Sequence, residues 1–303
     1  MKNIKSASVI MVLLAALLWS SNAPFVRYVT LDSFTVAGLR SLIAGVVLLP
    51  FLKPKKIKIN GYFFGFLSCF IALTFGIILA IRMTASSIAL GMQYTACLWL
   101  FIIAKPKKKD FTFLRLFPLI LVFVGVVVSM FSKTDRTTLV GNIIAISTSF
   151  SFAGMTYFAK KLNCENPIGL ASVSNLILGV IAIIISFVVS PGFEKFMAVD
   201  YKEWLVMLYL GVFQIGASYA LYYTGLRNVS ASTASMLCPL EMILGPIWTL
   251  IFFQEYPDVF GFIGFIVVIA GVLMEAITSS LHNKNKAQNT ALMSGQEVDI
   301  GKE

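Results

Sequence analysis

Long apolar runs alternate with short polar connections along almost the whole chain. A helix that crosses a bilayer needs about 20 mostly apolar residues, at a rise of about 1.5 Å per residue. Ten stretches meet this requirement, at residues 7–28, 34–52, 62–82, 85–104, 112–131, 138–160, 167–190, 203–225, 230–253 and 258–280. A strand of a membrane barrel takes about 9–11 residues and alternates between apolar and polar positions. The apolar runs of this chain are far longer and do not alternate, which excludes such strands. The pattern predicts an all-α membrane protein with ten transmembrane helices.

The two ends of the chain differ in pattern. Lys2 and Lys5 precede the apolar run Val9–Leu18, as in a secretory signal peptide. No A-x-A cleavage site follows, and the run continues to Tyr28, so we expect a retained first helix. Residues 282–303 are polar and lack periodicity, which predicts a disordered cytoplasmic tail.

Composition and charge agree with a membrane location. Of the 303 residues, 58% are hydrophobic and 13% charged, against about 45–50% and about 25% in soluble domains. The net charge of +10 does not indicate nucleic-acid binding, because the basic residues gather in short loops such as KPKKIKING and AKPKKKD. Placing both termini in the cytoplasm puts 17 of the 24 Lys and Arg residues on that side, as the positive-inside rule favours. We therefore expect a multi-pass protein of the cell (inner) membrane with cytoplasmic N- and C-termini.

Two parts of the chain repeat the same order of features. Residues 84–99, TASSIALGMQYTACLW, match residues 228–243, NVSASTASMLCPLEMI, at an offset of 144. Arg27 at the end of the first span matches Lys160 at the end of the sixth, at an offset of 133. Any two apolar stretches align somewhere, but here span count and charge agree as well. Because each half has an odd number of spans, five, the halves enter the membrane from opposite sides. We predict two inverted five-helix repeats, at residues 1–136 and 137–281.

One acidic residue lies deep within a predicted span. Glu241 is near the middle of residues 230–253, where burying a charge costs about 2.5–3.5 kcal/mol on the insertion scale. An intramembrane acid usually faces a cavity or a partner. Glu241 could therefore couple transport to protons or contact a substrate ammonium group. Alternatively, it holds helices together, since the nearby Pro239 frees backbone groups that it could organise.

Arg40 is the other charge well inside a span. It could pair with Glu241, or it could extend its guanidinium to the membrane interface. Its position in the first third of its helix favours extension to the interface.

Polar and aromatic side chains within spans complete the candidate site. Polar groups in hydrocarbon need partners, so such residues should face other helices or a cavity, although bundle packing or an interfacial belt explains many of them. The in-span amides include Gln214 and Asn175. The candidates for substrate contact, besides Glu241 and Arg40, are Trp19, Asn22, Tyr94, Tyr157, Tyr219 and Tyr223.

Signals for catalysis and cofactors are missing from the sequence. It contains no G-x-x-x-x-G-K-[ST], H-E-x-x-H or G-x-S-x-G motif. The single histidine, His282, lies in the tail, and none of the four cysteines forms a C-x-x-C pair. We expect no metal, no cofactor and no enzyme activity.

The order of these features resembles the EamA-type transporters of the drug/metabolite transporter superfamily. The matching segments are LLWSSNAPF (17–25), LRSLIAGVVLL (39–49), SASTASMLCPLEMILGPIWTLIFFQE (230–255) and GFIGFIVVIAGVLM (261–274). The resemblance extends from about residue 7 to about residue 280. It implies ten helices in two five-helix repeats, with amino acids, other metabolites or drugs as substrates and with export common.

The expected function is secondary transport of small metabolites by alternating access, with the substrate site near the midplane between the repeats. A non-transporting subunit or receptor would need only packing. A membrane-embedded enzyme would need clustered acids, histidines or thiols. Flux in proteoliposomes separates both alternatives from transport.

Overall fold

The structure of the protein is a computed structural model. It describes residues 2–84, 86–93, 95–103, 113–129, 131, 138–189, 196, 199–229, 234, 241, 244, 247–248, 250–252, 254, 258–271, 273–274 and 277–278. Every regular element within these ranges is helical, which confirms the predicted all-α class. The predicted tail at 282–303 lies outside the described residues.

Six described helices are long and apolar enough to cross a membrane. They are Ala7–Tyr28, Ser33–Phe51, Gly61–Met83, Leu139–Leu162, Pro167–Val189 and Tyr201–Leu226, and they confirm six of the ten predicted spans. Shorter apolar helices, Ile88–Leu100, Leu116–Val128 and Val259–Gly271, occupy three other predicted positions. The span predicted at 230–253 lies mostly outside the described residues, so the count of ten stays a prediction. The chain is a multi-pass membrane protein.

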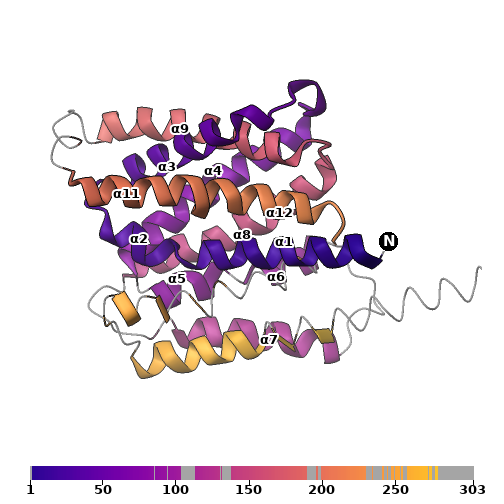
Figure 1. Cartoon of the computed structure of the whole chain (residues 1–303). Coiled ribbons are helices and arrows are strands. Elements are labelled where there is room, and N and C mark those ends of the chain that lie inside the picture. The colour runs from indigo at the N-terminus through magenta and orange to yellow at the C-terminus, as the bar shows by residue number, and fades with distance from the viewer. Residues whose placement is uncertain are drawn as a thin grey trace, which may run out of the picture.

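The described elements follow one another in a simple order (Figure 1). They are α1 (Lys2–Ser20), α2 (Asn22–Tyr28), α3 (Ser33–Leu48), η1 (Leu49–Phe51), η2 (Pro54–Lys56), α4 (Gly61–Met83), α5 (Ser86–Gln93), α6 (Ala96–Ile103), α7 (Phe113–Ser129), α8 (Leu139–Leu162), α9 (Pro167–Val189), α11 (Tyr201–Tyr209), the π-helical η4 (Leu210–Ala217) and α12 (Ser218–Leu226). α1 and α2 together make the first span, and α11, η4 and α12 together make the span Tyr201–Leu226.

Helix boundaries follow from side chains that satisfy free backbone groups. The Asp32 carboxylate accepts hydrogen bonds from the backbone N–H of Phe34 (3.0 Å) and Thr35 (2.9 Å) at the start of α3. The Thr138 hydroxyl accepts from Gly141 N–H (3.0 Å) at the start of α8. Such N-caps replace the intrahelical partners that the first turn lacks. α8 ends at Asn163, whose left-handed backbone (φ 40°) is a common way to stop a helix.

The first span is interrupted between Ser20 and Asn22. Pro24 has no N–H, and its ring crowds the carbonyl four residues back, at Ser20. The Ser20 hydroxyl donates to the Leu17 carbonyl at 2.7 Å. The interruption separates α1, which ends just after Trp19, from α2, which begins at Asn22.

The long helices pack in a reciprocal pattern. α1 packs on α12, α4 packs on α8, and α3 packs on α9. Figure 1 shows α7 beside the helix Val259–Gly271 at the lower edge of the bundle. The contact between α3 and α9 is close because glycines lie on both helices. A Cβ added at Gly45 would come within 2.6 Å of Leu176 Cγ, and one added at Gly179 within 2.7 Å of Leu42 Cγ.

Candidate functional site

A cavity lies within the bundle, between helices from both halves of the chain. The walls come from α1, α2, α3, α4, α5, α8, η4, α12 and the helical residue 241. The lining residues are Trp19, Asn22, Arg40, Leu73, Thr74, Ile77, Gln93, Phe152, Gln214, Ile215, Tyr219 and Glu241. The structure therefore brings five of the eight predicted site residues to one cavity.

Arg40 reaches this cavity from the middle of α3. Its side chain is 1% exposed, and Nη1 donates to Asn22 Oδ1 at 2.7 Å and to Gln214 Oε1 at 3.4 Å. The expectation that Arg40 extends to the membrane interface is wrong. Position along the helix indicated only depth, whereas the helix face and the two amide partners direct the guanidinium inward.

The backbone around Arg40 is irregular on two sides. Asn22 begins α2 just after the interruption of the first span, and Gln214 lies in the π-helical η4. Single π-helical turns inside α-helices are rare and occur often at functional sites. Both irregular segments thus supply an amide oxygen to the guanidinium of Arg40.

Glu241 lines the same cavity as Arg40. Its side chain is 4% exposed, so it lies inside the protein rather than on the outer surface of the bundle. Among the described lining residues, the basic Arg40 and the acidic Glu241 come from opposite halves of the sequence. A cavity whose lining combines a cation, an acid and polar side chains such as Asn22 and Gln214 can hold a polar solute.

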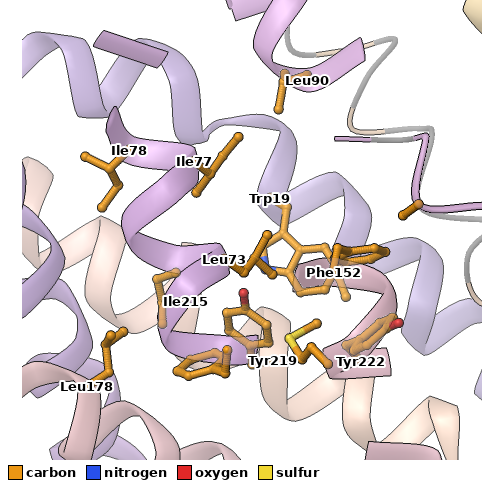
Figure 2. Close-up of a cluster of buried hydrophobic side chains, with 14 of the residues drawn as sticks. Trp19, Leu73, Ile77, Ile78, Leu90, Phe152, Leu178, Ile215, Tyr219 and Tyr222 are labelled. Atoms are coloured by element: carbon orange, nitrogen blue, oxygen red, sulfur yellow. The ribbon is translucent and has the colours of Figure 1, made fainter. Parts of the chain in front are cut away.

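Trp19, Phe152, Tyr219 and Tyr222 form an aromatic cluster beside the cavity, which we call the aromatic wall. Figure 2 shows these four side chains. The ring of Trp19 lies 5.0 Å from that of Tyr219, 5.1 Å from that of Tyr222 and 6.4 Å from that of Phe152, centroid to centroid. Figure 2 shows Leu73 beside Trp19 and Tyr219, with Ile77 and Ile215 nearby. Trp19, Phe152, Tyr219 and the three aliphatic residues all line the cavity, so an apolar body can pack there.

The remaining predicted residues lie elsewhere. Tyr223 is behind the aromatic wall, with its ring 5.5 Å from Tyr219 and its hydroxyl donating to Met155 Sδ at 3.6 Å. Tyr157 is half-buried, and the ammonium of Lys161 lies 5.8 Å from the centre of its ring, away from the cavity lining. Tyr94 lies outside the described residues.

Sequence reasoning did not select several polar residues of the cavity. Gln214 was noted as an in-span amide but not as a candidate, and Thr74 and Gln93 were not singled out. Their signal is a polar side chain within an apolar span, the same signal that pointed to Asn22. Thr74 gives this signal weakly, because a threonine hydroxyl can bond to the backbone of its own helix.

Basic side chains join helix ends beyond each end of the cavity. Arg27 donates to the carbonyls of Ile81 (3.3 Å) and Thr84 (3.2 Å) at the end of α4. We call this contact the Arg27 latch. It lies about one helical turn beyond the cavity residue Ile77.

A similar contact lies at the other end. Lys160 donates to the carbonyls of Leu226 (2.6 Å) and Val229 (2.7 Å), after the end of α12. We call this contact the Lys160 latch. It lies about two turns beyond Phe152 and Tyr219. Figure 1 shows α2 and the end of α12 at opposite ends of the bundle.

A second, smaller cavity adjoins the Lys160 latch. Lys160, Cys164, Tyr223 and Arg227 are among its lining residues. Burial raises the pKa of the Cys164 thiol, mainly through desolvation, so this side chain stays protonated near neutral pH. A neutral thiol makes a poor metal ligand.

Comparisons with known proteins identify relatives along the whole chain. The model of the EamA-like transporter family matches residues 6–131 and 139–276. A protein of Clostridium kluyveri named uncharacterized transporter is 25% identical over 315 residues, which cover 93% of this chain and 97% of that protein. An uncharacterized transporter of Archaeoglobus fulgidus is 25% identical over 276 residues, which cover 86% and 94%.

Solved structures share this fold, among them a crystal structure. It superimposes with a TM-score of 0.67 at 12% sequence identity, and the match covers 89% of this chain and 96% of that chain. At this identity the likeness concerns the fold alone.

Proposed function

Because the chain belongs to the EamA-like transporter family, we propose that this membrane transporter is a secondary transporter that exports small amphipathic metabolites, such as amino acids and related compounds, by alternating access. The observation that carries the proposal is the cavity between the two halves of the chain, which combines Arg40 and Glu241 with an aromatic wall. Secondary transporters built from inverted repeats bind their substrates at such a position.

The proposed architecture has ten transmembrane helices in two inverted repeats, at residues 1–136 and 137–281. Two separate segments of the chain match the family, one on each side of the proposed boundary. The helix packing also supports it. The first span of each half packs on the third span of the other, as α1 on α12 and α8 on α4, while the second spans, α3 and α9, pack on each other. A two-fold axis in the membrane plane relates such pairs.

Individual contacts support the same axis. Leu42 packs at Gly179 and Leu176 packs at Gly45, and the equivalent positions differ by the same amount, since 176 − 42 and 179 − 45 both equal 134. The two leucine–glycine contacts are thus reciprocal. A substitution at one should act like the equivalent substitution at the other.

The latches are related in the same way. Arg27 and Lys160 are the pair matched in the repeat, and their acceptor carbonyls correspond to within one residue, since 226 − 81 and 229 − 84 both equal 145 and the sequence match has an offset of 144. In the proposed orientation, with both termini in the cytoplasm, the Arg27 latch lies at the extracytoplasmic end of the cavity. The Lys160 latch lies at the cytoplasmic end. Opening one latch at a time would give access to the cavity from one side at a time.

Within the cavity we assign a role to each group of residues. Glu241 is the proton-coupling residue, and Arg40 with Asn22 forms a polar end of the substrate site. Trp19 and Tyr219 pack against the apolar part of the solute. Tyr157 and Tyr223 are not lining residues of the cavity. With Tyr94, they stay predicted candidates for substrate contact, and substitutions at these positions can be tested in the same assays.

Flux in proteoliposomes tests the proposal. Candidate solutes come from comparing metabolites in medium and cells with and without overexpression of the protein. We expect vesicles containing the purified protein to take up an exported solute faster than empty vesicles, and an imposed proton gradient to accelerate uptake. Normal insertion without flux for any solute enriched in the medium would contradict transport and favour a non-transporting subunit.

A further inference from the structure

Four buried polar atoms along the cavity lack a hydrogen-bond partner among the residues that the structure describes. They are Trp19 Nε1, Arg40 Nε, Thr74 Oγ1 and Gln93 Oε1, and all four residues line the cavity. Buried polar groups in native proteins are almost always paired. Four orphan groups around one cavity therefore indicate a ligand that supplies the partners.

The orphan groups have a common chemical preference. Trp19 Nε1 and Arg40 Nε can only donate hydrogen bonds, and the Thr74 hydroxyl can donate as well. Their shared partner must accept hydrogen bonds. Gln93 Oε1 is the one orphan that can only accept.

The charge of Arg40 narrows the choice of acceptor. A guanidinium stays protonated in proteins, and its planar donors match the two oxygens of a carboxylate. The hydrogen-bond partners of Arg40 are the neutral amides of Asn22 and Gln214, and neither supplies an anion. With Arg40 1% exposed, an anionic ligand group in the cavity would gain a charge-assisted hydrogen bond in a site of low dielectric constant.

We propose that the cavity recognises the carboxylate of its solute, which accepts hydrogen bonds from Arg40 Nε, Trp19 Nε1 and the Thr74 hydroxyl. The inference rests on the proposed function only in taking this cavity as the transport site. The apolar body of the solute packs on the aromatic wall. Gln93 Oε1 can receive a second polar group such as an ammonium. A solute that carries only a cation is disfavoured, because it would lie beside Arg40.

Binding measurements with a matched series of small molecules test this inference. The full-length protein in nanodiscs is titrated with phenylalanine, hydrocinnamate, phenylalaninamide and phenethylamine, and Kd is read from ligand-dependent thermal stabilisation. Phenylalanine and hydrocinnamate carry the carboxylate, and the other two do not. We expect each carboxylate to bind at least about tenfold more tightly than its counterpart, in line with the usual strength of hydrogen bonds to charged groups. Equal affinities, or no binding of either carboxylate, overturn the inference.

Comparing phenylalanine with hydrocinnamate also shows whether the preferred solute is a zwitterion or a simple carboxylate. Tighter binding of phenylalanine than of hydrocinnamate indicates a zwitterion whose ammonium reaches Gln93. Equal binding indicates a simple carboxylate. Both outcomes support carboxylate recognition.

Conservative substitutions test whether the preference for carboxylates comes from the hydrogen-bond donors of Trp19 and Arg40. Trp19→Phe keeps an aromatic ring and removes the N–H, so carboxylate affinity should fall about tenfold while affinity for the amide stays the same. Arg40→Gln should remove the preference for carboxylates, and Arg40→Lys should restore part of it. Trp204→Phe is the matched control, because Trp204 is 40% exposed and lies outside the cavity lining. An unchanged preference in both Trp19→Phe and Arg40→Gln overturns the inference.

Flux separates the failure of this inference from the failure of transport. Flux of phenethylamine without carboxylate preference would leave the proposed transport in place and overturn carboxylate recognition. Carboxylate binding without flux would support recognition and contradict transport.

Discussion

Proton-driven accumulation of solute is expected to disappear in the Glu241→Gln variant, while exchange of labelled for unlabelled solute continues. Glutamine has nearly the shape of glutamate and keeps its hydrogen-bonding oxygen, but it cannot take up or release a proton. If Glu241 couples transport to protons, the variant should ignore an imposed pH gradient. We expect the uptake rate of the variant to be the same with and without the imposed gradient, because no proton binds or leaves at position 241.

Glu203→Gln is the matched control for this result. Glu203 is also a buried acid, at 9% exposure, but its carboxylate accepts hydrogen bonds from Thr30 N–H (2.9 Å) and the Thr30 hydroxyl (3.0 Å), away from the cavity lining. This variant should keep gradient-driven uptake. If uptake and exchange both decrease in Glu241→Gln and KM increases, Glu241 would instead be a residue that binds an ammonium group of the substrate. Wild-type behaviour in every assay would leave Glu241 with a structural role.

Gly45→Leu is expected to destabilise the whole bundle. A Cβ at this position would lie 2.6 Å from Leu176 Cγ and 2.9 Å from the Leu176 backbone nitrogen. A side chain can change rotamer, but a backbone atom inside a helix cannot, so α3 and α9 must separate. Overpacking usually costs about 1–3 kcal/mol, and the loss of small-residue packing is felt strongly in membranes, where close backbone approach drives helix association.

Thermal unfolding of purified variants measures this effect. Gly179→Leu should lower Tm by a similar amount, because its Cβ would meet Leu42 in the reciprocal contact. Gly61→Leu is the control, since a Cβ at Gly61 meets nothing within 4 Å. Equal Tm values for Gly45→Leu and Gly61→Leu would show that α3 and α9 do not depend on the close contact.

The sequence was most informative where a long apolar run had polar ends. The runs at Gly61–Met83 and Pro167–Val189 have the highest hydropathy of the six spans, and both were predicted to within a few residues. Hydropathy measures the preference of a segment for lipid, so it locates a span without showing how neighbours pack. Trp19 and Asn22, both predicted as candidates for substrate contact, line the same cavity.

Side-chain direction was the part that sequence could not provide. The depth of Arg40 along its helix suggested the interface, but its direction depends on where α2 and η4 lie, and these contacts join distant parts of the chain. The π-helical turn at Gln214 has no compositional signal, because it arises from packing rather than from propensity. Tyr219 and Tyr223 are four residues apart on one face, yet only Tyr219 reaches the cavity.

The side from which the cavity opens tests the central claim most directly. We suggest a variant without native cysteines that carries Thr74→Cys as a probe in the cavity. A membrane-impermeant thiol reagent is then applied to right-side-out and inside-out vesicles. With Arg27 and Lys160 both unchanged, the cysteine at position 74 should react from both sides, and bound solute should slow the reaction. In the proposed orientation, Arg27→Gln removes the hydrogen bonds of the Arg27 latch at the extracytoplasmic end, and Lys160→Gln removes those of the Lys160 latch at the cytoplasmic end.

Two opposing shifts are expected. Arg27→Gln should increase labelling from outside, and Lys160→Gln should increase labelling from inside, each by about tenfold, since hydrogen bonds from a charged donor contribute about 1.5–3 kcal/mol. Such a result would agree with two inverted halves that expose one shared cavity in turn. Shifts in the same direction, or a probe that reacts only with a lipid-soluble reagent, would contradict the account.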